Sequence, residues 1–282
     1  MSKLGNLLKN IEEFIAFQQD EDFDAVQVNP ATLKELLSYF DNPERAPQPA
    51  SRPAAVKPVA RQAQPKPAPK PIEKPKPTIQ LPDFQSMEEI AEHISQCKRC
   101  PLCKTRSLTV PGEGNVNRPE IMFIGEGPRF EEDKQGRPLV GPAGQLFAKM
   151  VAAMGYTREE VFIGTVIKCR AFHTETNKDR RPTADETFNC LPYLKAQIKL
   201  IKPKVIVALG QTASRILLNE KAAITQLHGK WRKFEGIDLM PTYQPDLLLR
   251  HPEYKGDTWS DLKAVLAHLG KPVPQPKKKQ AP

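Results

Sequence analysis

Residues 120–125 read Glu120-Ile121-Met122-Phe123-Ile124-Gly125, and this stretch decides the fold class. A short apolar run that ends at a glycine is typical of a strand buried on both faces of a sheet. Three similar runs follow along the chain, over Val161–Ile167, Lys204–Leu209 and Asp238–Pro241. We therefore predict four buried strands between Glu120 and Pro241.

Helical patterns separate and follow these strands. They cover Gln145–Met154, Ala184–Ile201, Gln211–Leu218 and Thr258–Leu269. Strands that alternate with helices indicate parallel pairing, with helices on both faces of the sheet. The pattern predicts an α/β domain of three αβα layers around a four-stranded parallel sheet. Sites in such folds form on loops that leave the C-terminal ends of the strands, here 125–144, 168–182 and 242–250.

Composition divides the 282-residue chain into four parts. Residues 46–82 hold 11 of the 29 prolines and no aromatic residue, so we predict a disordered linker rich in Pro, Ala and Lys. Residues 1–45 form a short helical segment before it, 83–270 the α/β domain, and 271–282 a basic disordered tail. Within residues 1–45, apolar residues at helical spacing predict two short helices, over 3–19 and 30–40, which cannot bury their apolar stripes alone. They are expected to dock on the domain, on a protein partner or on a second copy.

The basic charge is concentrated in the segments that are predicted to be flexible. The formal net charge is +9 overall, with −5 on residues 1–45, +6 on the linker and +4 on the tail. Lysines on flexible segments beside a folded domain suit attraction to nucleic-acid phosphates. The alternative is that they only keep these segments solvated.

The cysteine content and the N-terminus indicate a reducing compartment. No apolar stretch is long enough to span a membrane, and the N-terminus lacks the pattern of a signal peptide. Five cysteines, an odd number, then favour reduced thiols or metal ligands over disulfides. We expect a cytoplasmic protein with no membrane partner.

The cysteines are spaced as candidate metal ligands. Cys97, Cys100 and Cys103 recur every third residue at the head of the domain, Cys169 follows the second strand, and Cys190 lies in the next helix. The last two can reach the same end of the sheet. Zinc and a [4Fe–4S] cluster both accept four cysteines. The alternative is that Cys169 and Cys190 are small buried apolar residues.

Further motifs follow one another along the domain. They are Cys97-x-x-Cys100-Pro101-Leu102, Gly112-Glu113-Gly114-Asn115, Gly125-Glu126-Gly127-Pro128, Gly136-Arg137-Pro138-Leu139-Val140-Gly141-Pro142-Ala143-Gly144, Lys168-Cys169-Arg170, Ala208-Leu209-Gly210, Gly229-Lys230-Trp231, Pro241-Thr242-Tyr243-Gln244-Pro245 and Leu248-Leu249-Arg250. From Glu89 to Leu269 the order and spacing resemble those of family 4 uracil-DNA glycosylases. The resemblance implies a [4Fe–4S] cluster on Cys97, Cys100, Cys169 and Cys190, and it leaves Cys103 as the extra cysteine, either a buried thiol or a substitute ligand.

The resemblance also implies a function: a DNA base-excision repair glycosylase, a hydrolase of N-glycosyl bonds whose partner is DNA and whose substrate is uracil or another damaged base. Such an enzyme extrudes the base into a pocket, where a carboxylate orients water and donors stabilise the departing base. The implied catalytic residues are Glu126 and Gln244. The implied base-pocket residues are Gly127, Leu139, Thr165 and Asn177, and the implied DNA-binding residues are Arg129, Leu248 and Arg250.

Four of these positions depart from the family pattern. Leu139 stands where the family has Phe, Thr165 where it has Asn, Gln244 where it has His, and Arg129 where it has Gly. Leucine loses the ring face that stacks on a base, and glutamine cannot become cationic as histidine can. Three hypotheses remain: an active glycosylase, a DNA-binding module that kept the fold and the cluster but lost hydrolysis, and a zinc-bound scaffold that binds protein through its N-terminal helices.

Overall fold

The computed structural model of the chain describes residues 79–274. The two predicted N-terminal helices, residues 46–78 of the predicted linker and residues 275–282 of the predicted tail lie outside the described residues. Within the described part of the chain, no helix combines the length and the apolar character needed to cross a membrane.

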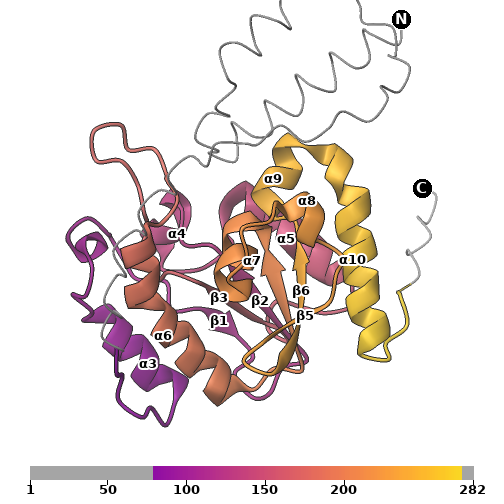
Figure 1. The fold of residues 1–282 in the computed structure, drawn as a ribbon, viewed down its shortest axis with the longest axis horizontal. Helices are drawn as coiled ribbons and strands as arrows, with labels where there is room; N and C mark the ends of the chain where they lie inside the picture. The colour runs from indigo at the N-terminus through magenta and orange to yellow at the C-terminus, as the bar shows by residue number, and fades with distance from the viewer. Residues whose placement is uncertain (1–78, 275–282) are drawn as a thin grey trace, which may run out of the picture. The chain divides into compact units, whose positions relative to one another are not determined.

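A mixed sheet of six strands forms the centre of the domain (Figure 1). The strands are β1 (Glu113–Gly114), β2 (Ile121–Gly125), β3 (Phe162–Thr165), β4 (Val205–Leu209), β5 (Arg232–Phe234) and β6 (Ile237–Thr242), in the spatial order β1-β3-β2-β4-β6-β5. The central four strands pair in parallel. The two short edge strands, β1 and β5, pair antiparallel with their neighbours.

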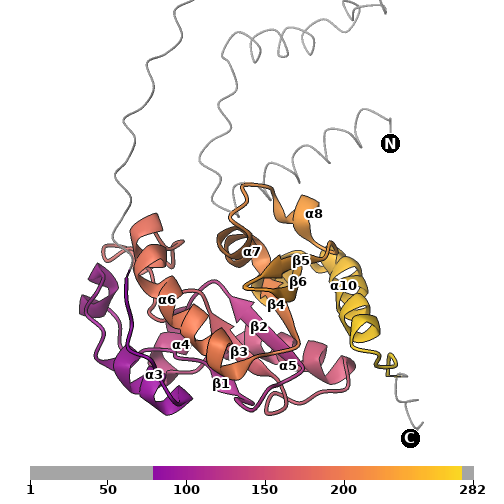
Figure 2. The ribbon, with the colours of Figure 1, turned by 60° about the horizontal axis from the view of Figure 1, so that its bottom comes forward.

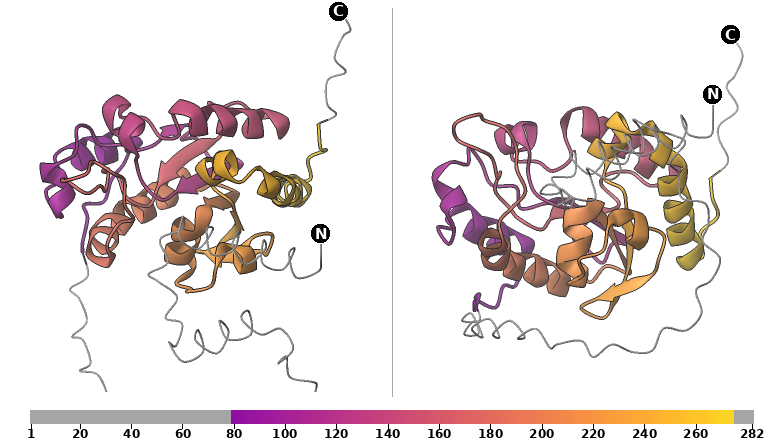
Figure 3. Two further views of the ribbon diagram at one scale, coloured as in Figure 1. Left: turned by 90° about the horizontal axis from the view of Figure 1, so that it is seen from above. Right: turned by 45° about the horizontal axis from the view of Figure 1, so that its top comes forward.

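Helices cover both faces of this sheet (Figures 2 and 3). The helices are α3 (Met87–Ser95), α4 (Phe130–Gln135), α5 (Gly141–Ala153), α6 (Ala184–Ile201), α7 (Gly210–Leu218), α8 (Ile224–Leu227), α9 (Pro245–Arg250) and α10 (Lys255–His268), with the 3-10 turns η2 (Pro101–Lys104) and η3 (Pro252–Tyr254). Side chains alternate along each strand, so β2 faces two cores at once. Met122 packs in the core with α3, α6 and α7, whereas Phe123 packs in the core with α5 and α10.

The predicted fold class is confirmed, with two differences. All four predicted strands are present and parallel, but the short antiparallel strands β1 and β5 extend the sheet at its edges. Helix α5 begins at Gly141, before the predicted Gln145, because Pro142 lies in the first turn, where its missing N–H costs nothing. Helix α6 has the predicted bounds, and Thr183 caps it by accepting a hydrogen bond from the Glu186 amide.

The strand order also locates the crevice in which a ligand can bind. Strand β2 lies between β3 and β4 in the sheet. The chain crosses from β2 to β3 on one side and then back past β2 to β4 on the other, so the direction in which strands are added reverses at β2. In open α/β sheets, ligands bind beyond the C-terminal ends of the strands at such a reversal. The loops after β2, β3 and β6 meet there.

Candidate active site and cysteine centre

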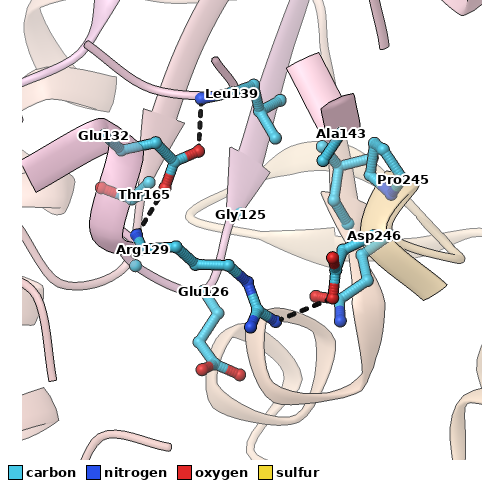
Figure 4. A pocket seen from close by; sticks show the side chains of 12 residues that line it. Gly125, Glu126, Arg129, Glu132, Leu139, Ala143, Thr165, Pro245 and Asp246 are labelled. Atoms are coloured by element: carbon cyan, nitrogen blue, oxygen red, sulfur yellow. Dashed lines mark hydrogen bonds and ion pairs between the residues drawn. The ribbon is translucent and has the colours of Figure 1, made fainter. Parts of the chain in front are cut away.

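A pocket lies where the four parallel strands end (Figure 4). The strand ends contribute Gly125 from β2, Thr165 from β3 and Leu209 from β4, and Gln244 follows β6. The other walls come from the loop after β2, from α4 and the segment that follows it, and from the first turns of α5 and α9: Glu126, Gly127, Arg129, Glu132, Leu139, Ala143, Pro245 and Asp246. The cavity has a volume of about 50 Å³.

Glu132 fixes the loop that carries the pocket residues. Its carboxylate accepts hydrogen bonds from the Arg129 amide at 2.7 Å and from the Leu139 amide at 2.6 Å. The side chain is buried, and this burial raises the pKa of the carboxyl above its usual value. Glu132 therefore acts on the backbone, as a cap of α4 and as a tie to Leu139.

Leu139 is held in a strained conformation. Its φ of 49° lies in the left-handed region, which a leucine adopts at a cost of about 1–2 kcal/mol. Besides the bond to Glu132, its carbonyl accepts a hydrogen bond from Arg158 at 3.0 Å. A Cβ on Gly144 would lie 1.9 Å from that carbonyl oxygen, so only glycine fits there. Strain that neighbours enforce in this way is common at binding sites.

Thr165 brings a polar atom into the pocket wall without an internal partner. Its hydroxyl is buried and has no hydrogen-bond partner among the described residues. The backbone carbonyl of Thr165 accepts a hydrogen bond from the buried Lys168 ammonium at 2.7 Å. The same ammonium group donates a second hydrogen bond to the side-chain oxygen of Gln197, also at 2.7 Å. Burial lowers the pKa of Lys168 to about 8. The backbone at Thr165 is thus fixed, whereas its hydroxyl can bond to a ligand.

Glu126 and Gln244 line the pocket from the ends of different strands. Glu126 follows β2, and its carbonyl accepts a hydrogen bond from the Ile167 amide at 3.0 Å, which positions the residue. Its carboxylate extends away from Leu139 in Figure 4. Gln244 is the N-cap residue of α9, and its side chain makes no capping bond. Gly210 leaves room for it, since a Cβ there would lie 3.0 Å from the Gln244 side chain.

Charged side chains connect the rim of the pocket. Arg129, which follows β2, pairs with Asp246 of α9 at 3.3 Å, and Figure 4 shows its side chain extended toward that carboxylate. Asp246 also pairs with Arg250 at 3.2 Å. On the other side, Asp179 lies 4.0 Å from Arg129 and 2.5 Å from Arg170. Two acids and three arginines therefore form a continuous row.

A second cavity gathers cysteines. Cys97, Cys100, Cys169 and Cys190 all line it, and Cys103 does not. They come from the segment after α3, from the loop after β3 and from α6. As the side chains stand, no group of three or more His, Cys, Asp or Glu residues in 79–274 is arranged to hold a single metal ion.

The hydrogen-bond donors around the cysteines suit thiolate ligands, whereas burial alone favours the neutral thiols. Burial raises the pKa of Cys169 to about 11 and that of Cys190 to about 12, and it raises the pKa of Cys100 as well. Metal ligation requires thiolates, and a bound cation offsets the cost of burying them. Two donors already reach the sulfurs: Arg106 bonds to Cys169 Sγ at 3.3 Å, and the Lys168 amide bonds to Cys190 Sγ at 3.2 Å.

The comparisons with known proteins include a family model and several strongly similar relatives. The family model of the uracil DNA glycosylase superfamily matches residues 111–263. Type-4 uracil-DNA glycosylase of Sulfurisphaera tokodaii is 40% identical over 191 residues, which are 64% of this chain and 84% of that protein. The chain belongs to the type-4 uracil-DNA glycosylase family. The relative from Archaeoglobus fulgidus is 36% identical over 68% of this chain and 97% of its own length, and that from Thermotoga maritima is 42% identical over 58% and 84%.

The structure places most of the residues implied by the type-4 pattern at the pocket. Those that line it are Glu126, Gly127, Arg129, Leu139, Thr165 and Gln244. Asn177 does not line it: the residue is exposed, and its side-chain oxygen accepts a hydrogen bond from Arg170 at 2.9 Å. The long loop after Cys169 carries Asn177 outward, so the structure does not bring it to the pocket.

The implied DNA-binding residues also differ in position. Arg129 and Arg250 lie in the charged row at the rim. The Leu248 side chain is buried, with an exposed fraction of 1%, whereas that of Leu249 is 42%. Of these two residues of α9, Leu249 rather than Leu248 is therefore exposed at the surface.

Six residues that line the pocket were not among the predicted site residues: Gly125, Glu132, Ala143, Leu209, Pro245 and Asp246. Leu209 ends a predicted strand, and the rule that sites form at strand ends could have found it. Asp246 is different, because its role depends on an ion pair with Arg129, which lies on a distant segment of the chain. No local pattern indicates such a pair.

Proposed function

We propose that this type-4 family member is a DNA base-excision repair glycosylase that extrudes uracil from DNA and hydrolyses its N-glycosidic bond. The observation that carries the proposal is the position of Glu126 in the wall of a pocket built by four strand ends. The type-4 motif assigns the catalytic acid to this residue. The relatives named above are type-4 uracil-DNA glycosylases, which makes uracil the first base to test.

The pocket residues suit this hydrolysis. The Glu126 carboxylate orients a water molecule and accepts its proton as the oxygen bonds to C1′ of the sugar. The C1′–N1 bond breaks, and its electrons leave with the uracil ring, which later takes up a proton from solvent. The amide of Gln244 can donate to the negative oxygen of the leaving base, which stabilises the transition state. Leu139 supplies apolar contact to the ring, and the Thr165 hydroxyl can bond to its edge.

The test compares two carboxylates of the same region. Glu126→Gln should abolish uracil release and leave DNA affinity nearly unchanged, because the carboxylate acts on the transition state. Glu131→Gln removes the same charge from the exposed side of α4 and should keep wild-type activity. Single-turnover release is measured on single- and double-stranded oligonucleotides with uracil, hypoxanthine or xanthine. Release by Glu126→Gln at the wild-type rate would reject the assignment.

The second candidate function is a DNA-binding module without hydrolysis. It is favoured by the pocket itself, in which Leu139, Thr165, Gln244 and Arg129 replace the family residues. DNA binding by the wild type without release of any base, on any of these oligonucleotides, would establish this alternative.

We further propose that Cys97, Cys100, Cys169 and Cys190 hold a [4Fe–4S] cluster. Support comes from the common cavity, from the donors at Cys169 and Cys190, and from the exclusion of Cys103 from the lining. When bound, the cluster supplies thiolate bonds that join the segment after α3, the loop after β3 and α6. The zinc-bound scaffold is the alternative that metal analysis distinguishes.

DNA contacts are proposed at the rim and in the basic segments. Arg129 and Arg250 are candidates for phosphate contacts, with Arg250 also the candidate to enter the duplex, and the exposed Leu249 is a further candidate for DNA contact because Leu248 is buried. Deletion of 271–282 together with neutralisation of the linker lysines should weaken binding equally for all sequences and flatten its salt dependence. If the dependence of DNA affinity on salt concentration did not change, these segments would serve only to keep the protein soluble.

The organisation of the whole chain remains a proposal as well. We propose the domain boundaries 1–45, 46–82, 83–270 and 271–282, a cytoplasmic location, and docking of the N-terminal helices on a partner, on the domain or on a second copy. Size-exclusion chromatography with light scattering on the full chain and on a chain that starts at residue 79 separates self-association from the other two.

A further inference from the structure

Arg129 and Asp246 close the pocket from opposite sides. Both residues line it, one from the loop after β2 and the other from α9, and their side chains pair at 3.3 Å. Exposed fractions of 43% for Arg129 and 32% for Asp246 place the pair at the rim rather than at the floor. Arg129 stands at a position where the family pattern has glycine, and a chain with glycine there cannot form this pair.

The pocket behind the pair is too small for a base. Its volume is about 50 Å³. By comparison, an engineered protein cavity that holds benzene measures about 150 Å³. A pyrimidine ring with its two carbonyl oxygens is larger than benzene, so the pocket must widen before a base can bind. The strand ends cannot shift without disturbing the sheet, and two hydrogen bonds hold the backbone of Leu139 in place. The half-exposed side chain of Arg129 is therefore the part of the wall that moves at the lowest cost in free energy.

The charges around the pair show what can open it. Arg129 has two carboxylates nearby, from Asp246 and Asp179, and Asp246 has two guanidinium groups, from Arg129 and Arg250. Ion pairs this exposed contribute little free energy, so they exchange partners readily. A DNA phosphate that approaches the rim offers Arg129 a competing partner, because a guanidinium can bind two phosphate oxygens at once, whereas the pair with Asp246 joins Nη2 to one carboxylate oxygen.

We propose that Arg129 and Asp246 form a latch over the base pocket, which opens when a DNA phosphate replaces Asp246 as the partner of Arg129. This inference rests on the proposed function, because it concerns access of the base to that site. DNA binding thereby shifts the pocket toward its open state, and without DNA the latch lowers the affinity for free bases.

The first experiment uses free uracil as the probe, so it depends neither on DNA nor on hydrolysis. Asp246→Asn and Arg129→Ala should each bind uracil about three- to fivefold more tightly than the wild type, because the closed state no longer competes. The double variant should show the same gain and no more, since both changes remove one interaction. Asp257→Asn, an equal charge change on the exposed first turn of α10, should leave the affinity unchanged. Ligand-observed NMR titration gives the four affinities.

The second experiment follows the DNA side with 2-aminopurine placed next to uracil in a duplex. Asp246→Asn should raise the rate of base extrusion about three- to fivefold, whereas Asp257→Asn should change only the affinity for the duplex.

The outcomes separate the latch from the proposed function. Equal uracil affinity of the wild type and Asp246→Asn, including no binding by either, overturns the latch, as does a double variant whose gains add. No excision of any base by the wild type, with the uracil-affinity difference present, rejects hydrolysis and keeps the latch.

Discussion

At Leu139, contacts with two neighbouring side chains fix a strained backbone conformation in the pocket wall. The backbone needs a positive φ at this position, and Glu132 and Arg158 hold it there on both sides. The sequence placed Leu139 and Thr165 in the pocket through the family motifs. It could not reveal the strain or the unpaired hydroxyl, because both arise from contacts between loops that are distant in the chain.

Thr165 gives the prediction at this scale. Thr165→Val keeps the shape of the side chain and removes a buried hydroxyl that has no partner in the described residues. The free energy of unfolding should stay the same or rise by about 1 kcal/mol, because an unsatisfied polar group is costly. Uracil excision should fall about tenfold, as expected for the loss of one hydrogen bond of about 1.4 kcal/mol to the base.

Urea unfolding and single-turnover kinetics on the same samples check both effects. The combination matters, since a purely structural threonine would change stability and activity in the same direction. Excision that is unaffected by Thr165→Val would remove the hydroxyl from the list of base contacts.

At the scale of elements, the buried strands were predictable and the edges were not. Each of the four parallel strands is a run of apolar residues covered by helices on both sides, so its pattern is visible in the sequence. Strands β1 and β5 are two and three residues long and contain polar or charged residues, and only their neighbours make them strands. The outward path of the loop with Asn177 is likewise set by its bonds to Arg170.

Glu120 links several of these elements and gives a prediction about pH. It precedes β2 and pairs with Lys204, which precedes β4, at 2.9 Å, and with Lys271 beyond α10 at 3.1 Å. Tyr156, just after α5, donates a third bond at 2.7 Å. The bond from Lys204, followed by those from Tyr156 and Lys271, lowers the pKa of Glu120 to about 2.

Because the folded state lowers this pKa, ionised Glu120 stabilises the protein above its ordinary pKa of about 4.5. That contribution disappears as the pH falls from about 4.5 toward 2. Glu120→Gln should therefore lower the free energy of unfolding at pH 7 by on the order of 1 kcal/mol, since both lysines are well exposed.

The gap between the wild type and Glu120→Gln should narrow steadily below pH 4.5. Thermal unfolding at a series of pH values measures it, with the exposed Glu159→Gln as the control. A gap that is constant from pH 7 to pH 3 would mean that packing, and not charge, accounts for the effect.

At the scale of the whole molecule, the pocket and the cysteine centre are joined through one short segment. Thr165 is in the pocket wall, and Cys169 lines the other cavity only four residues later. Between them, Lys168 bonds through its side chain to the Thr165 carbonyl and through its amide to Cys190. Disorder at the cysteine centre would therefore reach the base pocket directly.

The last prediction tests this arrangement with the chain's own cysteines. Cys169→Ser and Cys190→Ser should each lose iron and the broad visible absorbance expected of a [4Fe–4S] protein, and they should unfold at lower temperature, because ligation is coupled to folding. Cys103→Ser is the matched control, since Cys103 does not line the cavity, and it should keep both iron and stability. Protein purified without oxygen is analysed for iron and zinc, and its unfolding is followed by circular dichroism.

If Cys103→Ser lost iron as well, the ligand set would be incorrect. Zinc in place of iron in the wild type would contradict the cluster itself. Loss of iron from Cys190→Ser with unchanged excision and unchanged melting would show that the two sites are independent despite the short segment that joins them.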